Sequence, residues 1–499
     1  MTRSPLNRLR SAYRRVVATG DATQAATERL EATVGDLRGQ VDRLTHRLYE
    51  SAGIVDDIRA VTGTRPLAAS DDVLGHVTKH ADRLHDAVSY TVRRQPFTGA
   101  RTRVLFLVHH IEAWDSLHGL VAELRTLPDF EVVVASIPRR FRGSPGPVDE
   151  DLVHAGLSAR GVPHLRIDLT SDDDALEVVR ALAPSIIFRQ SQWDDDVADA
   201  FSTQNLSFAR LCLVPYETMG IIENMPIEGV ADSAVDNHYH RRAWRVFCAG
   251  EHSRAVAAAH STRGGEQFVA TGHPKADRLR SAQAVWPLDR ATARTPRLKV
   301  VWSAHHTISE DWTSFGMAHL VAPDMLAWAR SEPDVDFVFM PHPALRPYID
   351  DPESPVTPAE ADAFAEAWNE LPNTTIFTGG DYAPLLAASD VMVTDGLSML
   401  VEYQFMERPL IYLERPGHRP FNAAGTLLLD GITRAASVED ARSYLASLTP
   451  ETRAATADAQ RRSIDALFET APAVPRIVQA LREGIAAERS AEAYGSVTR

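Results

Sequence analysis

Apolar runs alternate with amphipathic stretches over most of the chain, beginning at Arg103. Runs of consecutive apolar residues predict buried strands, and apolar residues spaced three and four apart predict the helices between them. The predicted strands are 103–108, 131–135, 185–188, 210–214, 245–249, 298–303, 335–340, 374–377, 391–393 and 410–413, and the predicted helices include 115–125, 172–182, 317–330, 382–389 and 397–406. This alternation predicts an α/β fold with parallel sheets and right-handed crossovers.

The alternation breaks once and then restarts. A polar, proline-bearing stretch at 281–297 separates two sets of strands, and the second set begins at Leu298. We therefore expect two Rossmann-like domains facing a cleft, at 99–285 and 286–475, with ligand at the carboxyl ends of the strands. The final helix, 476–499, is expected to cross back over the first domain, with Pro475 at a plausible first helical position.

Residues 1–98 form a predicted helical extension. Apolar residues at alternating spacings of four and three give it an a/d seam, made by Leu30, Val34, Leu37, Val41, Leu44 and Leu48. Such a seam is typical of a short coiled coil, and residues 24–50 would then join two copies into a homo-oligomer. Gly35 and Gly39 weaken the helix, and packing of this helix on its own domain is the alternative.

Charge and composition narrow the class of protein. The net charge of −15 over 499 residues disfavours binding to nucleic acid. Residues 1–16 are the exception, because they carry five arginines and no acid; they either contact the anionic inner membrane face or form a solvated terminus. Cys212 and Cys248 form no metal or disulfide motif. Without a signal peptide or membrane-spanning run, we expect a cytoplasmic protein, peripheral on the plasma membrane at most.

The stretch from Thr375 to Gly425 carries the clearest chemical pattern. A buried strand ends at Thr394, the turn Asp395-Gly396 follows, and a helix then begins. This arrangement aims backbone N–H groups at a phosphate. Ser398 adds a hydroxyl near the helix start, and Glu402 lies one turn further along the same face. The stretch predicts a nucleotide site with phosphate at 394–398 and Glu402 toward the ribose.

Four blocks between Arg103 and Leu445 resemble the CDP-glycerol glycerophosphotransferase family, the teichoic-acid and capsule polyol-phosphate transferases. The blocks lie at 104–117, 272–279 (Gly-His-Pro-Lys-Ala-Asp-Arg-Leu), 340–343 (Met-Pro-His-Pro) and 381–403 (Asp-Tyr…Ser-Asp…Thr-Asp-Gly-Leu-Ser…Glu-Tyr). The resemblance implies a GT-B-like fold, an acceptor-binding first domain and a nucleotide-binding second domain. It implies transfer of a polyol phosphate from a CDP-activated donor to a cell-surface glycopolymer or lipid-linked acceptor, as in cell wall biogenesis.

Two departures from the family pattern leave alternatives open. The family has a serine pair where this chain has Leu397-Ser398, and its His-Gly-Thr-Pro element is replaced by Val-Pro-Tyr-Glu-Thr-Met at 214–219. The alternatives are a GT-B glycosyltransferase that uses a nucleotide sugar, an enzyme like the UDP-sugar 2-epimerases, or a non-catalytic partner subunit.

The candidate catalytic residues follow predicted strands. His342 is the first choice for contact with the leaving phosphate, and His109 is the first choice for the base that deprotonates the acceptor. His110, Asp115 and Glu217 are the next candidates for the base.

Further histidines and a lysine complete the predicted site. His305 and His306 are expected at the phosphate, with at most one in contact. Lys275 makes either a phosphate contact or an interdomain ion pair. We predict neither a metal nor another cofactor, because no histidine spacing matches a metal triad.

Overall fold

The computed structural model describes residues 79, 82–83, 85–93, 97, 101–140, 146–288, 297–309, 313–378 and 380–495. The chain divides into two compact units, Met1–Ala87 and Val88–Arg499, and the whole α/β fold belongs to the second. The basic segment 1–16, the seam at 24–50 and part of the stretch 281–297 lie outside the described residues. In the described part, no helix combines the length and apolarity needed to cross a membrane.

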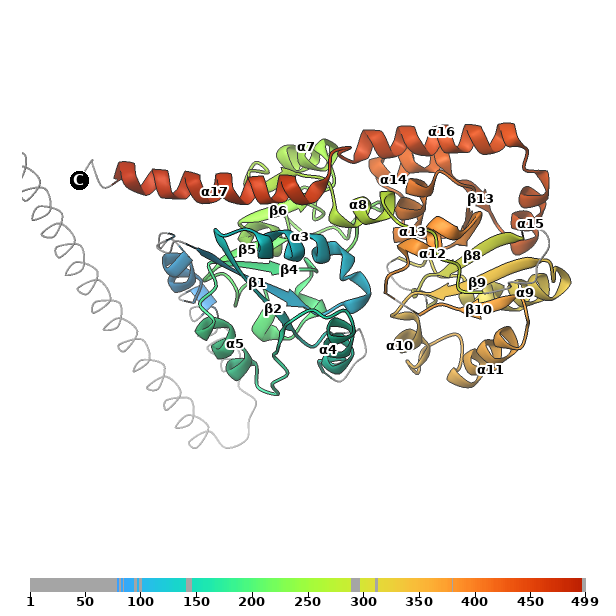
Figure 1. The fold of residues 1–499 in the computed structure, drawn as a ribbon, viewed down its shortest axis with the longest axis horizontal. Helices are drawn as coiled ribbons and strands as arrows, with labels where there is room; N and C mark the ends of the chain where they lie inside the picture. The colour runs from blue at the N-terminus through green and yellow to red at the C-terminus, as the bar shows by residue number, and fades with distance from the viewer. Residues whose placement is uncertain are drawn as a thin grey trace, which may run out of the picture. The chain divides into compact units, whose positions relative to one another are not determined.

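The first half is built on a seven-stranded parallel sheet in the order β3-β2-β1-β4-β5-β6-β7 (Figure 1). Its strands are β1 (Thr102–Val108), β2 (Phe130–Ser136), β3 (Leu165–Arg166), β4 (Ile186–Arg189), β5 (Arg210–Leu213), β6 (Arg245–Cys248) and β7 (Phe268–Ala270). The strands expected from the apolar runs are confirmed. Strands β3 and β7 were not predicted from the sequence. Both residues of β3 are exposed at the sheet edge, and the apolar run of β7 is only three residues long.

The second half has its own six-stranded parallel sheet, in the order β10-β9-β8-β11-β12-β13. Its strands are β8 (Leu298–Ala304), β9 (Val335–Pro341), β10 (Thr374–Ile376), β11 (Val391–Thr394), β12 (Leu410–Leu413) and β13 (Thr433–Ala435). The two sheets are separate, as predicted. Strand β13 was not among the predicted strands, because its central residue is exposed and gives no apolar run.

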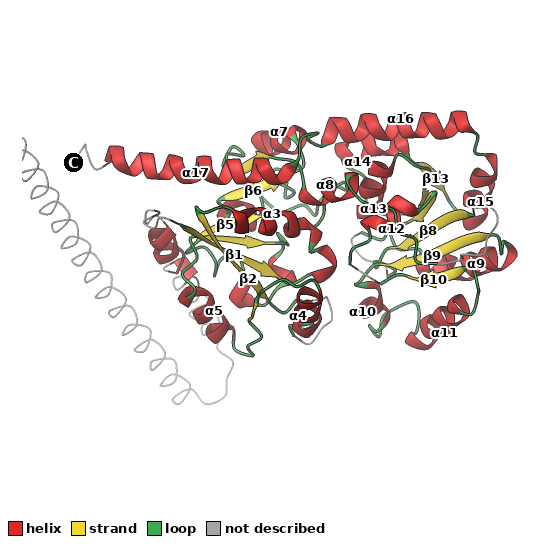
Figure 2. Cartoon of the chain, in the orientation of Figure 1, coloured by secondary structure: helices red, strands yellow, loops and turns green. Residues whose placement is uncertain are grey.

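Helices connect the strands and pack against each sheet (Figure 2). Those of the first half are α3 (Asp115–Thr126), α4 (Glu150–Ala159), α5 (Asp172–Ala181), α6 (His238–Arg242), α7 (Glu251–His260) and α8 (Pro274–Arg280). Those of the second half are α9 (Ala318–Ser331), α10 (Leu345–Ile349), α11 (Pro358–Asn369), α12 (Ala383–Ala388), α13 (Leu397–Glu402), α14 (Ala423–Leu428), α15 (Val438–Ser447) and α16 (Pro450–Leu467).

Strand β1 shows why the sheet is central to the core. Val104, Phe106 and Val108 belong to one buried cluster, and Leu105 and Leu107 belong to another. Because successive side chains of a strand point to opposite faces, β1 is buried on both sides. This burial explains the uninterrupted apolar run that predicted the strand.

The last helix, α17 (Ala473–Gly495), packs on the first half, as expected from the sequence. It begins at Ala473, so Pro475 is not at the first helical position that was predicted for it. Ile477, Leu481 and Ile485 lie four residues apart and join the cluster that also contains Leu120 and Leu124 of α3. This spacing places them on one helix face. The chain therefore returns to its first sheet after completing the second.

Candidate functional site

The carboxyl end of β1 carries His109 and His110, and Gln190 after β4 fixes both. Gln190 Oε1 accepts hydrogen bonds from the backbone N–H groups of His109 and His110, each at 3.0 Å. Its amide nitrogen donates to the carbonyl oxygens of His110 at 3.0 Å and Ala113 at 3.2 Å. One side chain thus uses both ends to hold the loop after β1 in a single conformation.

The two histidines have different surroundings. His109 is completely buried, and burial together with the charge of His110 lowers its pKa well below the usual range. Arg139, which follows β2, lies with Nη1 3.3 Å from His110 Nδ1 and forms an ion pair with Glu112 at 2.9 Å. Since a guanidinium only donates, Nδ1 of His110 is the acceptor and its proton sits on Nε2.

His109, His110 and Asp196 form a group whose possible ligand atoms lie within 4.8 Å of one another. A metal would need a lone pair on His110 Nε2, but the contact with Arg139 places the proton there. Asp196 Oδ2 lies 4.0 Å from Nε2. With its proton on Nε2, His110 is a hydrogen-bond donor at that atom and not a metal ligand.

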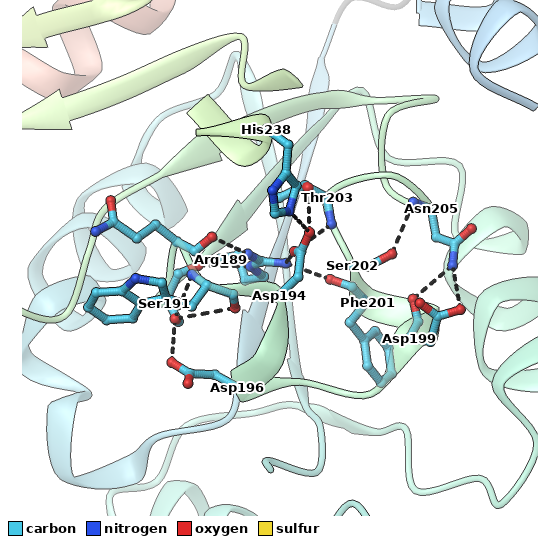
Figure 3. Close-up of polar contacts among 12 residues, drawn as sticks. Arg189, Ser191, Asp194, Asp196, Asp199, Phe201, Ser202, Thr203, Asn205 and His238 are labelled. Atoms are coloured by element: carbon cyan, nitrogen blue, oxygen red, sulfur yellow. Dashed lines mark hydrogen bonds and ion pairs between the residues drawn. The ribbon is translucent and has the colours of Figure 1, made fainter. Parts of the chain in front are cut away.

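The loop after β4 is held by Arg189, whose side chain is completely buried (Figure 3). Its guanidinium donates to the carbonyl oxygens of Ser191 and Gln192, both at 2.8 Å, and of Phe201 at 2.9 Å. It also forms an ion pair with Asp194 at 2.6 Å. A buried cation that meets three carbonyls and a carboxylate fixes the path of the loop.

Asp194 completes this anchor. Its carboxylate accepts hydrogen bonds from the backbone N–H and the hydroxyl of Thr203, at 2.8 and 2.7 Å, and lies 2.9 Å from His238 Nε2 (Figure 3). Burial alone would raise the pKa of Asp194, but the contacts with His238 and Arg189 outweigh it and lower this pKa. The carboxylate therefore stays ionised and keeps the loop anchored.

Two other carboxyl groups near the edge of the first sheet have raised pKa values, unlike Asp194. Burial raises the pKa of Asp196 to about 6, although Ser191 donates a hydrogen bond to it at 2.5 Å. Glu217 follows β5 and is half-buried; burial, and then the charge of Asp196, raise its pKa to about 7. A carboxyl group that titrates near neutrality can accept a proton during a reaction and release it afterwards.

The carboxyl edge of the second sheet carries three histidines. His305 and His306 follow β8, and His342 follows β9. The ring centroids of His306 and His342 lie 4.3 Å apart, and those of His305 and His342 lie 5.8 Å apart. Burial lowers the pKa of all three, so the rings are neutral at pH 7.

Hydrogen bonds define the protonated nitrogens of two of these rings. The backbone N–H of Ala344 donates to His342 Nδ1 at 3.1 Å, so the proton of the neutral ring is on Nε2. The backbone N–H of Thr307 donates to His305 Nδ1 at 3.3 Å, which places that proton on Nε2 as well. Each ring thus has an Nε2–H that can donate to an anion.

The buried carboxylate of Asp395 holds the loop after β8 at this edge. Its carboxylate accepts hydrogen bonds from the backbone N–H groups of His305, at 2.6 Å, and Met317. Thr394 Oγ1 accepts from the backbone N–H of Gly396 at 2.9 Å and closes the turn after β11. Ser398, predicted at the phosphate, is half-buried in the first turn of α13. Asp395 is 1% exposed, and these contacts give it a role in shaping the loop.

Lys275 and Glu402 form a buried ion pair between α8 and α13. Lys275 Nζ lies 3.2 Å from Glu402 Oε1 and donates to the carbonyl of Tyr216 at 2.8 Å. The hydroxyl of Tyr382 donates to Glu402 Oε2 at 2.5 Å, so both carboxylate oxygens are engaged within the protein. Of the two roles open to Lys275, the structure contains the interdomain ion pair.

Asp115, the first residue of α3, lies near this pair. Both carboxylate oxygens are buried without a hydrogen-bond partner within the described part of the chain. Burial raises the pKa of Asp115 to about 6, and the nearby ammonium of Lys275 opposes the rise. Burial disfavours the ammonium of Lys275, but Glu402 and Asp115 outweigh it and raise the pKa of Lys275.

Charged groups of the first half act on a histidine of the second half. Burial and His306 are the main causes of the lowered pKa of His342, and the first-half groups His110, Arg139 and Lys275 add to it. The two halves are also in direct contact, because Lys275 of α8 pairs with Glu402 of α13 and donates to the carbonyl of Tyr216 after β5. Gly380 of the second half packs against Glu112, which follows β1. These contacts bring loops from the carboxyl edge of the first sheet against the second half.

A cavity of about 580 Å³ adjoins the carboxyl ends of β12 and β13. It is lined by Glu414, Arg415, Pro416, Gly417, His418, Arg434, Ala435 and Ala436. Phe315 connects the cavity to the histidine cluster, because its ring centroid lies 4.5 Å from that of His418 and 6.4 Å from that of His305.

The sequence did not single out Arg139, Gln190, Gln192, Asp196 or Tyr382. The first four follow the carboxyl ends of β2 and β4, where polar residues are expected to face a ligand. Applying that rule to every predicted strand would have found them. The pairing of Tyr382 with Glu402 joins two helices of the second half and leaves no signal in the sequence.

No family model and no curated protein matches the sequence, whereas solved structures match the fold.

Among solved structures, the chain is similar to UDP-GlcNAc 2-epimerase from Neisseria meningitidis bound to UDP-GlcNAc, with a TM-score of 0.52, 11% identity, and coverage of 77% of this chain and 100% of that one. It is similar to S. aureus MnaA in complex with UDP, with a TM-score of 0.50, 11% identity, and coverage of 76% and 96%. A looser likeness, too distant to bear on function, is to the wall teichoic acid polymerase TagF (TM-score 0.49, 12% identity, coverage 85% and 100%). The first two similarities identify the fold as a GT-B-like pair of parallel α/β domains.

Proposed function

We propose that the chain is a GT-B-type transferase that moves a polyol phosphate from a CDP-activated donor to a cell-surface glycopolymer or lipid-linked acceptor. The observation that carries the proposal is the contact of Lys275 with both Glu402 and the carbonyl of Tyr216, which brings the loop that carries Glu217 to the second half. Neutral histidine donors lie at the edge of the second sheet, and carboxyl groups that titrate near neutrality lie at the edge of the first. The CDP-polyol donor rests on the motif resemblance.

The donor phosphates would lie against the second sheet. His305 and His342 each have a proton on Nε2. Each Nε2–H can donate a hydrogen bond to a phosphate oxygen of the donor. Ser398 adds a hydroxyl. The nucleoside would occupy the cavity next to β12 and β13, whose 580 Å³ falls within the range of small-molecule sites.

Glu217 is the base that the geometry favours. It is half-buried, whereas His109 is completely buried and the carboxylate oxygens of Asp115 are buried, so Glu217 is the more accessible of these candidates. Its pKa of about 7 suits a base at neutral pH. In the proposed reaction the acceptor hydroxyl loses its proton to Glu217, and its oxygen attacks the phosphorus that carries the polyol. The bond to CMP breaks, and CMP leaves with the electron pair, stabilised by His342.

Glycosyl transfer from a nucleotide sugar is a second candidate. The segment 214–219 lacks the His-Gly-Thr-Pro element of the resembled family and carries Glu217 instead. A carboxylate base serves a sugar acceptor as well as a polyol acceptor, and the remaining groups of the site suit either diphosphate.

The leaving nucleotide distinguishes these functions. The protein would be incubated with CDP-glycerol, CDP-ribitol, UDP-GlcNAc or a dTDP-sugar, each with polyol-phosphate and glycolipid acceptors, and the products separated by chromatography. Release of CMP together with an extended acceptor is the expected result. Release of UDP or dTDP would favour glycosyl transfer, and conversion of a UDP-sugar without acceptor would favour epimerisation. No product with any donor would favour a non-catalytic partner subunit.

A further inference from the structure

Glu217 stands at the end of a directed chain of hydrogen bonds that begins in α6. The backbone N–H of Asn237 donates to His240 Nδ1 at 3.2 Å. His240 is 1% exposed, and burial lowers its pKa to about 3, so its ring is neutral. A neutral imidazole that accepts at Nδ1 has its proton on Nε2.

This proton fixes the next side chain. His240 Nε2 lies 3.1 Å from Gln192 Oε1. The opposite orientation of the Gln192 amide would place its NH₂ group against the N–H of His240, with no acceptor between them. The amide nitrogen of Gln192 therefore faces Glu217, and it donates to Glu217 Oε1 at 3.1 Å.

We propose that Gln192 and His240 are positioning residues, which orient the carboxylate of Glu217 and hold it toward the acceptor through this chain. The inference rests on the proposed role of Glu217 as the base. The bond from Asn237 fixes the tautomer of His240. The bond from His240 fixes the orientation of the Gln192 amide, and the bond from Gln192 holds Oε1 of the Glu217 carboxylate. Within the described residues, Glu217 Oε2 has no hydrogen-bond partner, so it is the oxygen left to accept the proton.

The supports of both positioning residues are rigid. Arg189 donates a hydrogen bond to the carbonyl oxygen of Gln192 at 2.8 Å and so holds the backbone of Gln192. Figure 3 shows the loop that Arg189 anchors. The ring of His240 contacts those of Tyr239 and Phe268, at centroid distances of 4.5 and 5.4 Å. A base is effective when it is held in one orientation, and these contacts supply that restraint.

The chain also affects the proton affinity of Glu217. Burial and the charge of Asp196 raise its pKa, and the ammonium of Lys275 opposes them. The N–H of Gln192 stabilises the ionised carboxylate and so opposes the rise as well. Without this bond, Glu217 would hold its proton at a higher pH and act as a base over a narrower range.

The test uses Gln192→Met, which keeps the length of the side chain and removes the donor, and His240→Phe, which keeps the ring and removes both nitrogens. Asn205→Leu is the matched control, because Asn205 lies on the same loop and bonds the carbonyl of Asp199 instead. The pKa of Glu217 would be measured in the full chain by ¹³C NMR of labelled glutamate carboxyls, with Glu217→Gln to assign the signal. The pH profile of turnover and the melting temperature would be measured in parallel.

Gln192→Met is expected to raise the pKa of Glu217 by about one unit, from the usual strength of a hydrogen bond to a charged group. His240→Phe should cause a smaller rise, and the double variant should match Gln192→Met, since both changes act through one bond. Asn205→Leu should cause none. An unchanged Glu217 pKa in folded Gln192→Met, or additive effects in the double variant, would overturn the inference. If the NMR pKa moves but the acid limb of turnover does not, the chain stands and Glu217 is not the base.

Discussion

Lys275 Nζ lies 3.2 Å from Glu402 Oε1, and this buried ion pair joins α8 of the first half to α13 of the second half. Their side chains are 5% and 0% exposed. Tyr216 and Tyr382 satisfy the other polar atoms of the pair, at 2.8 and 2.5 Å. Tyr216 directly precedes Glu217, the proposed base. The ammonium of Lys275 therefore lies near Glu217 and lowers its pKa, against the effect of burial.

Removing one partner of this pair should be more harmful than removing both charges. Lys275→Met leaves a buried carboxylate unpaired and should destabilise the protein by about 3–5 kcal/mol. Adding Glu402→Gln should recover much of the loss, because the amide oxygen still accepts from Tyr382. Denaturant-unfolding midpoints of the two single variants and the double variant measure this coupling. Equal loss in Lys275→Met and in the double variant would show that the ion pair does not join the two halves.

Glu217→Gln tests the assignment of the base. Turnover should fall about 10²–10⁴-fold, the usual effect of losing a general base. Affinity for the nucleotide donor should stay within about twofold, because the phosphates lie against the second sheet. His109→Ala is the comparison, since the sequence pointed to that residue first. If His109→Ala abolishes turnover while Glu217→Gln retains it, the base is His109 and the loop after β1 must open during the reaction.

Asp196→Asn should move the pH profile in a defined direction. The charge of Asp196 raises the pKa of Glu217, which is about 7. Only the ionised carboxylate acts as a base, so turnover falls as the pH drops through this pKa. Removing the charge lowers the pKa, and the acid limb should shift to lower pH by about half a unit to one unit. Asp199→Asn, an exposed change on the same loop, is the control; an unmoved limb, or a shift to higher pH, would contradict the proposed coupling.

A bulky side chain in the cavity beside β12 and β13 should block the nucleoside. Ala436 lines this cavity and is exposed, so Ala436→Trp should fill it without disturbing the core. Affinity for CDP should drop at least about tenfold, because the ring would occupy the space of the base. Ala454→Trp, an exposed change on α16, should bind CDP normally. Unchanged CDP affinity in Ala436→Trp would place the nucleoside elsewhere.

The two sheets could be predicted because their strands are buried on both faces and therefore appear as apolar runs. Strands β3, β7 and β13 were missed, because short strands at the sheet edges give no long apolar run. Among the site residues, the positions of His305, His306 and His342 at strand ends followed from the same pattern.

The roles of other site residues depend on contacts that no sequence period encodes. Glu402 has the helical position expected of a ribose ligand, yet it pairs with Lys275, which lies 127 residues away. Asp395 follows a strand as expected, but its carboxylate bonds two backbone N–H groups of the loop after β8. His109 also ends a strand, and only the packing around β1 shows that it is completely buried.

The central claim is that a CDP-activated donor binds at the histidine edge of the second sheet. Isothermal titration of CDP-glycerol into the wild-type protein, His342→Ala and His260→Ala tests it most directly, because His260 is exposed at the end of α7. We expect binding to the wild type and to His260→Ala with equal affinity, and a loss of about tenfold or more in His342→Ala, the effect of removing a hydrogen bond to a charged group. No binding of CDP-glycerol to the wild type, or equal affinity in His342→Ala, would contradict the claim.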